Sequence, residues 1–203
     1  MPFFLEPDYL NKPGTFTESH KERMIRKFGS IEKFNEVKAL HGLVRRGTEA
    51  GLKKIGFCEE KLDIRIQSAT LNSHRLVLLV EQLYGWAKAE ALYTRLNCEH
   101  FIDGGILNDR SLLSKCVSSI GLPDHHILQL EAYLDNAQRG RDETLDLYEQ
   151  ALLLGVNSIP TLIVDGKYTL NGAVPAEEVE QVLQQVIHEG VTGRRAFQVR
   201  KIP

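Results

Sequence analysis

The hydrophobic positions follow a helical period through most of the chain and a period of two near its C-terminal end. Apolar residues recur three or four positions apart, and residues such as Ser19, Ser30 and Asp109 can cap the segments that they begin. This pattern predicts helices over 19–28, 30–55, 76–83, 86–101, 111–120, 125–134 and 141–154. The loops between these segments are short, which is typical of a compact helical bundle.

The last third of the chain changes character. Thr161–Val164 and Lys167–Leu170 predict a β-hairpin, because Asp165-Gly166 between them suits a type I′ turn. Pro160 stands directly before the first strand, where its missing N–H does not interrupt the ladder. An apolar stripe predicts a final helix over 176–189. Short extended segments are also expected at 3–5 and 62–66.

The composition narrows the function classes. The 203 residues include 25 Lys and Arg against 27 Asp and Glu, a formal net charge of −2, and 42% are hydrophobic. The hydrophobic fraction is typical of a soluble globular protein. A net charge this close to zero produces no overall electrostatic attraction to nucleic acid or to an anionic membrane. The apolar runs are too short to cross a bilayer, and the first residues lack the features of a signal peptide. Three cysteines, none in a Cys-x-x-Cys, favour a reducing compartment, so we expect a cytoplasmic protein.

The cysteines offer little chemistry by themselves. Cys116 shares a helical face with apolar residues and is expected to be a buried core thiol. Cys98 and His100 cannot assemble the four ligands of a zinc site, so we predict no metal. Cys58 lies in a loop-like stretch, but nothing near it in sequence would lower its pKa.

His74 and Arg75 stand at the start of a predicted helix. Helix N-termini expose N–H donors, so the pair could hold an anionic group of a substrate. Alternatively, Arg75 pairs with a carboxylate or caps a neighbouring element. Trp86 is expected to be a packing anchor between helices.

One stretch is specific enough to suggest a family. Gly155-Val156, Ile159–Ile163 and Gly172-Ala173 stand in the order helix, turn, X-Pro, hairpin and helix. This order resembles the closing half of the thioredoxin fold in the DsbA-like superfamily, and specifically the FrnE-like oxidoreductases. Thr70–Leu76 and Pro2–Asp8 are similar to two further segments of that family. Glutathione transferase kappa and 2-hydroxychromene-2-carboxylate isomerase are close relatives.

The resemblance implies an α/β thioredoxin-like fold with a large all-helical insertion. Its thioredoxin-like portion would comprise 1–15 and 137–190, the insertion 16–136, and a flexible basic tail 191–203. The family carries its Cys-x-x-Cys on a first strand and helix that would precede Pro2. The resemblance therefore implies either a segment upstream of this sequence in a longer natural protein or a non-catalytic relative. Neither Cys58, Cys98 nor Cys116 occupies the place of that motif, and we assign no catalytic residue.

The function that the resemblance implies is thiol–disulfide exchange with a protein partner, with Ile159, Pro160, His74 and Arg75 binding the substrate. A kappa-type transferase or isomerase that uses glutathione is one alternative, and a non-catalytic interaction module is another. No other cofactor is expected. The resemblance also predicts a cis Ile159–Pro160 bond and an unpaired edge on Thr161–Val164, through which the chain would self-associate.

Overall fold

The structure is a computed structural model that describes residues 2–41, 64–193 and 202. The chain forms two compact units, which are treated separately below: a helical unit, Glu6–Arg139, and a hairpin unit, Met1–Leu5 with Gly140–Pro203. The helical unit begins ten residues before the predicted insertion start at residue 16. The reason lies in the 3-10 helix η1 (Pro7–Asn11) and the residue before it. Glu6 precedes η1 and Tyr9 lies within it, and both side chains bond to residues of the helical unit.

The first part of the helical unit is built around a small antiparallel ladder. Strand β1 (Thr17–Ser19) pairs with β2 (Ile66–Ser68), and helices α1 (His20–Phe28) and α2 (Ile31–His41) follow β1. Ser19 caps α1 through a capping box, in which the Glu22 N–H donates to the Ser19 hydroxyl and the Ser19 N–H donates to the Glu22 carboxylate. The predicted continuation of α2 to residue 55, and residues 62 and 63 of the expected strand, lie outside the described residues.

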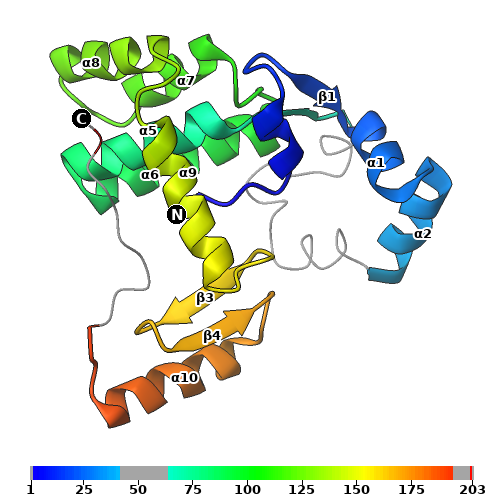
Figure 1. The fold of residues 1–203 in the computed structure, drawn as a ribbon, viewed down its shortest axis with the longest axis vertical. Coiled ribbons are helices and arrows are strands. Elements are labelled where there is room, and N and C mark those ends of the chain that lie inside the picture. Colours follow the sequence, from blue (N-terminus) through cyan, green and yellow to red (C-terminus); the bar gives the residue numbers. More distant parts are fainter. Residues whose placement is uncertain (1, 42–63, 194–201, 203) are drawn as a thin grey trace. The chain divides into compact units, whose positions relative to one another are not determined.

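Four helices form the larger part of the helical unit. Helices α5 (Leu71–Tyr84) and α6 (Trp86–Phe101) pack along each other, α7 (Arg110–Ser118) packs on α6, and α8 (Asp124–Asp135) packs on α7 and α5 (Figure 1). Asp109 caps α7 by accepting from the Ser111 and Leu112 N–H groups. Helix α5 begins five residues earlier than predicted. Thr70 stands at its N-cap and makes no side-chain cap bond.

The apolar positions of the predicted helices place eight leucines in the core: Leu76, Leu79, Leu83, Leu92, Leu112, Leu113, Leu128 and Leu147. Most of them are buried, but two are largely exposed. Leu83 and Leu128 are 55% and 65% exposed, and Leu112 is half-buried. Trp86, the expected packing anchor, is 70% exposed at the first position of α6. The helical period places a side chain on a helix face, but it does not show how far a neighbouring helix covers that face. The leucines that are buried as predicted are Leu76, Leu79, Leu92, Leu113 and Leu147, the last of them on α9 of the hairpin unit.

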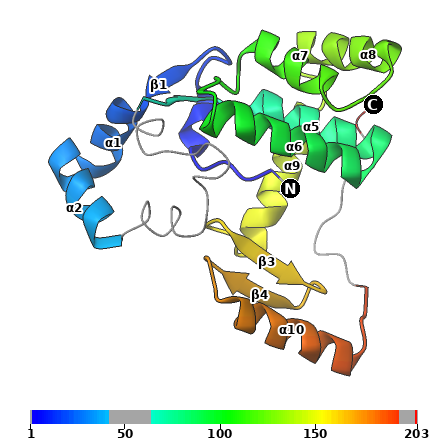
Figure 2. The same ribbon diagram turned by 180° about the vertical axis from the view of Figure 1, so that it is seen from behind.

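The hairpin unit consists of α9 (Arg141–Leu153), β3 (Thr161–Val164), β4 (Tyr168–Asn171) and α10 (Ala176–Glu189). β3 and β4 pair antiparallel, with Leu162 opposite Leu170. Asp165 and Gly166 have φ of 53° and 66°, the left-handed values that the predicted turn requires, although the loop is one residue longer than predicted. Helix α10 packs against β3, and Figure 2 shows it running along the hairpin.

Phe3–Leu5 is not a strand, contrary to the prediction. The Phe3 and Phe4 rings instead pack edge-on against the Tyr148 ring of α9, with centroids 5.9 Å and 5.0 Å apart. A strand needs a hydrogen-bonded neighbour, and three residues of apolar sequence do not supply one. Among the described residues, β3 and β4 therefore form a sheet of two strands. In the same part of the chain, no helix has the length and apolar character needed to cross a lipid bilayer.

Two leucines of the helical unit test the position of its core. Leu113 is 1% exposed and Leu128 is 65% exposed. We expect Leu113→Ala to lower the free energy of unfolding by about 2–5 kcal/mol, because it leaves a cavity, and Leu128→Ala to change it by less than about 0.5 kcal/mol. Urea denaturation followed by circular dichroism measures both. Equal effects of the two substitutions would show that this core is wrongly placed.

Candidate functional site: the Ile159–Pro160 loop

The loop from α9 to β3 is held at both of its ends. Gly155 adopts φ of 78° after α9, and the Val156 N–H donates to the Ala151 carbonyl at 3.0 Å, while the Val156 side chain is buried. At the other end, the Gly172 N–H donates to the Pro160 carbonyl at 2.8 Å, which continues the β3–β4 ladder by one pair. The position of Pro160 is therefore fixed by the hairpin itself.

Side-chain bonds further restrict this loop. The Thr161 hydroxyl lies 2.9 Å from the Ser158 carbonyl and 3.1 Å from the Asn171 side-chain oxygen. The Ile159–Pro160 peptide bond is cis. Ile159 is nevertheless 49% exposed, so an ordered loop presents an apolar side chain to solvent. Such a surface can contact an extended polypeptide without first becoming ordered, which reduces the entropic cost of binding.

Arg75, the second predicted binding position, lies in the helical unit and is fully buried. Its guanidinium donates to the Arg139 carbonyl from Nε at 2.8 Å, to the Asn136 carbonyl from Nη2 at 2.5 Å, and to Asn72 Oδ1 from Nη1 at 2.7 Å. It also lies 4.9 Å from the centre of the Tyr133 ring. These contacts correspond to the structural alternative, in which Arg75 fixes the start of α5 to the end of α8.

His74 stands beside Arg75 and belongs to the same unit. Burial lowers its pKa to about 4, because the charged imidazolium loses its hydration. The ring is therefore neutral at neutral pH and provides no positive charge for an anion. The two predicted pairs, His74 with Arg75 and Ile159 with Pro160, thus lie in different units and differ in exposure.

Cys116 is not suited to nucleophilic attack. Cys116 is completely buried on α7, and burial raises the pKa of its thiol to about 11, so the reactive thiolate is scarce at neutral pH. Cys98 is half-buried on α6, and both thiols are free. Cys58 lies outside the described residues. In the ranges that the structure describes, no three His, Cys, Asp or Glu side chains are grouped so that they could hold a metal ion.

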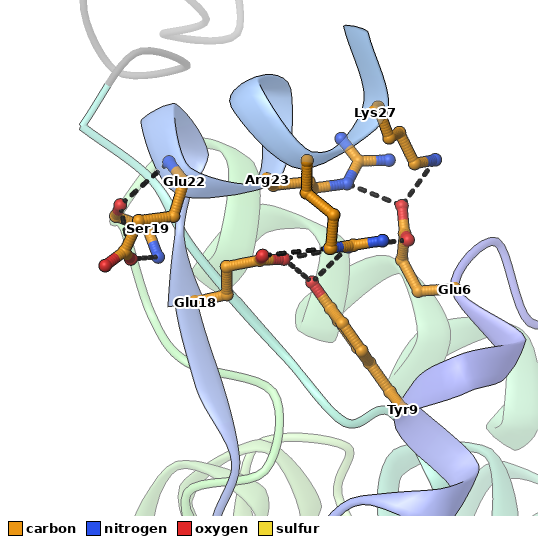
Figure 3. Close-up of polar contacts among 8 residues, drawn as sticks. Glu6, Tyr9, Glu18, Ser19, Glu22, Arg23 and Lys27 are labelled. Atoms are coloured by element: carbon orange, nitrogen blue, oxygen red, sulfur yellow. Dashed lines mark hydrogen bonds and ion pairs between the residues drawn. The ribbon is translucent and has the colours of Figure 1, made fainter. Parts of the chain in front are cut away.

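The sequence analysis missed a charge cluster in the helical unit. The Glu6 carboxylate accepts from Arg23 Nε at 2.6 Å, from Arg26 Nη2 at 2.9 Å and from Lys27 Nζ at 2.5 Å, and it is 10% exposed (Figure 3). All three cations lie on α1. Their spacing of three and four residues was the available signal, since it places three positive charges on one helix face that needs an acidic partner.

A second carboxylate completes this cluster. Arg26 also donates to Glu18 of β1 at 2.9 Å, and the Tyr9 hydroxyl of η1 donates to the same carboxylate. Burial by itself would raise the pKa of Glu6, but the bonds from Lys27 and the two arginines outweigh it and lower the pKa. The bond from Arg26 lowers the pKa of Glu18. Because its positive charges are already paired, the cluster fixes the chain before β1 to α1 and is no anion site.

The order of α9, the proline loop, the hairpin and α10, together with a helical unit placed before them in the chain, defines a DsbA-like thioredoxin fold with a large helical insertion. One solved structure that shares it is the crystal structure of a probable DsbA oxidoreductase from Streptomyces coelicolor. The match has a TM-score of 0.73 at 22% identity and covers 98% of this chain and 76% of that chain. No protein-family model matches the chain, and no curated protein matches it.

The charge cluster predicts a specific acid sensitivity. The pKa values of Glu6 and Glu18 are lower in the folded chain than their ordinary value of 4.5, so the stability that these carboxylates contribute is present above that pH and is lost below it. We expect the free energy of unfolding to fall as the pH drops below about 4.5, and to fall less steeply in Glu6→Gln. Urea denaturation between pH 3 and pH 7 measures this. Glu36→Gln, on an exposed helix position, is the control. Equal slopes for wild type and Glu6→Gln would contradict the assigned role of the cluster.

Proposed function

We propose that this chain is a relative of the DsbA-type thiol–disulfide oxidoreductases, of the FrnE-like branch, and that its described part binds the thiol- or disulfide-bearing polypeptide. The observation that carries this proposal is the Ile159–Pro160 loop, which is ordered by the hairpin and still exposes Ile159 within a DsbA-like fold. The apolar side chain and the neighbouring backbone provide contacts for an extended substrate segment. Two free cysteines support the further proposal of a cytoplasmic location.

Binding and chemistry are separable in this reaction. In thiol–disulfide exchange, a thiolate attacks one sulfur of a disulfide, forms a mixed disulfide and releases the other sulfur as a thiolate. The attacking thiol must ionise near neutral pH and must be accessible. The buried Cys116 thiol meets neither condition, and the 203 residues contain no Cys-x-x-Cys. The substrate-binding role of this chain therefore does not require turnover by its own thiols.

A non-catalytic interaction module is the second candidate function. It is favoured by the high pKa of Cys116, together with the exposure of Ile159. Both functions use the same loop and differ in whether sulfur chemistry follows binding. Turnover that depends on one of the chain's own cysteines would distinguish the oxidoreductase from the interaction module.

We expect the 203-residue chain to show no turnover in the reduction of insulin by dithiothreitol above the uncatalysed rate. The physical reasons are that none of the three cysteines stands in a Cys-x-x-Cys, and that Cys116 is buried and its raised pKa keeps it protonated at neutral pH. The appearance of turbidity from the insulin B chain measures the reaction. Turnover that is abolished by Cys58→Ser or Cys98→Ser would contradict this expectation and would assign the nucleophile to that cysteine.

Binding is expected even without turnover. Reduced, unfolded ribonuclease A should bind the chain, and Ile159→Asp should weaken binding at least about tenfold, because it places a charge on the apolar contact. The matched control is Val191→Asp. Val191 is 70% exposed and apolar, but its neighbour Thr192 bonds to Asp165 in the hairpin turn, at the far end of the hairpin from Pro160.

Surface plasmon resonance with immobilised chain measures this binding. No effect of Ile159→Asp would refute the proposed binding loop. Reduced glutathione is titrated in parallel, followed by chemical-shift changes in the chain. Saturable binding of glutathione that Ile159→Asp abolishes, without binding of ribonuclease, would instead assign the kappa-type function.

A further inference from the structure

The Thr161 side chain closes the loop that presents Ile159. Its hydroxyl lies 2.9 Å from the Ser158 carbonyl oxygen, so this hydrogen bond spans Ile159 and Pro160. The same hydroxyl lies 3.1 Å from Oδ1 of Asn171, which stands directly opposite Thr161 in the β3–β4 ladder. One side chain of β3 therefore connects the loop to β4.

The backbone ladder ends at Pro160 with one hydrogen bond in place of the usual two. The Gly172 N–H donates to the Pro160 carbonyl, but Pro160 has no N–H with which to return the bond. By the alternation of an antiparallel ladder, the next pair, Thr161 with Asn171, has no backbone bonds between its members, and in such a pair the side chains come closest. The Thr161 hydroxyl therefore continues the restraint past the end of the ladder, as far as Ser158.

The two bonds of Thr161 exist together in one arrangement of hydrogens. A hydroxyl has a single hydrogen to donate, but its oxygen can also accept. When the hydrogen goes to the Ser158 carbonyl, the Thr161 oxygen accepts from Asn171, whose amide needs only a half-turn about its terminal bond to present its NH2 group. The bonds then run from Asn171 through Thr161 to Ser158. This order requires a hydrogen-bond donor at position 171, which an aspartate would not supply.

We propose that Thr161 is a positioning residue of the polypeptide-binding loop: supported by the Asn171 amide, its hydroxyl holds the Ser158 carbonyl and so fixes the backbone that carries Ile159. The inference rests on the proposed function, since it concerns the loop that binds the polypeptide there. A loop that is already ordered loses less conformational freedom on binding, so its affinity is higher. Valine has nearly the shape of threonine and also favours strands, so Thr161→Val removes the hydroxyl and leaves β3 in place.

The order of the loop in the free chain tests this role without any partner. Nitrogen-15 relaxation gives the backbone order parameter of Ile159, which is about 0.85 in a rigid segment and below about 0.6 in a flexible one. We expect Ile159 to be rigid in the unchanged chain and in Thr161→Ser, and flexible in Thr161→Val. Asn171→Asp should also make it flexible, because the carboxylate attracts the hydroxyl hydrogen away from Ser158.

The matched control is Thr169→Val, which removes an exposed hydroxyl from β4 and should leave Ile159 rigid. Circular dichroism checks that each variant is folded, and Asn171→Asp tests the proposal independently should Thr161→Val fail to fold. A rigid Ile159 in either of these two variants would overturn the proposal.

Binding of reduced, unfolded ribonuclease A, measured by surface plasmon resonance, connects this order to function. We expect Thr161→Val to weaken binding at least about fivefold, and Thr161→Ser and Thr169→Val to weaken it less than about twofold. In the Ile159→Asp background, Thr161→Val should have less than about a twofold effect, because the contact that it positions is already lost. An equal loss in both backgrounds is expected of a general structural role and would overturn the proposal.

The same measurements separate a failure of this inference from a failure of the proposed function. If the unchanged chain does not bind ribonuclease A, the proposed function fails and the positioning role fails with it. If the unchanged chain binds and Thr161→Val binds equally well, the positioning role alone is overturned.

Discussion

The pairing of β3 with β4 is the interaction on which the candidate binding loop depends, because it fixes the position of Pro160. In the described chain, β4 satisfies the inner groups of β3, and the Gly172 N–H extends the ladder to the carbonyl of Pro160. α10 packs against β3, and the Tyr168 hydroxyl bonds to Glu189 near the end of that helix. These contacts order the hairpin and the loop before it. They leave the side chain of Ile159 exposed.

In the helical unit, by contrast, the buried charged groups Arg75 and Glu6 have hydrogen-bond partners within the unit. The Arg75 guanidinium donates to two carbonyls and an amide oxygen, and the Glu6 carboxylate accepts from three cations. A buried charge without such partners would be strongly unfavourable, so these networks fix the start of α5 and the chain before β1 in single positions. We therefore attribute a supporting role to the helical unit, and the binding surface that we propose lies in the hairpin unit.

The regular elements could be predicted from the sequence, because the signals for them are local. Gly85 and Gly190 mark helix ends, and the apolar period defines α6 and α10 with the bounds that the structure has. Asp165-Gly166 marks the turn. The Phe3–Leu5 strand could not be judged in this way, because a strand exists only if another segment pairs with it, and local sequence does not show the partner.

The roles of the candidate site residues depended on distant contacts in the same way. The partners of Arg75 are carbonyls some sixty positions away in the sequence, so spacing could not distinguish an anion site from an anchor. The burial of Leu83 and Leu128 was wrongly predicted for the same reason. The helical period of the apolar residues was correct, but the sequence did not show how far neighbouring helices cover these positions.

The central claim is that the β3–β4 ladder orders the loop that carries Ile159. Amide hydrogen exchange of the free chain, resolved for each residue by NMR, tests it most directly, because exchange slows where an N–H is hydrogen-bonded within a stable ladder. The structure predicts slow exchange for Gly172, whose N–H donates to the Pro160 carbonyl, and for Leu162 and Val164 of the ladder. Exchange of the Gly172 amide as fast as that of an unfolded chain would contradict the account, since the loop would then not be held by the hairpin.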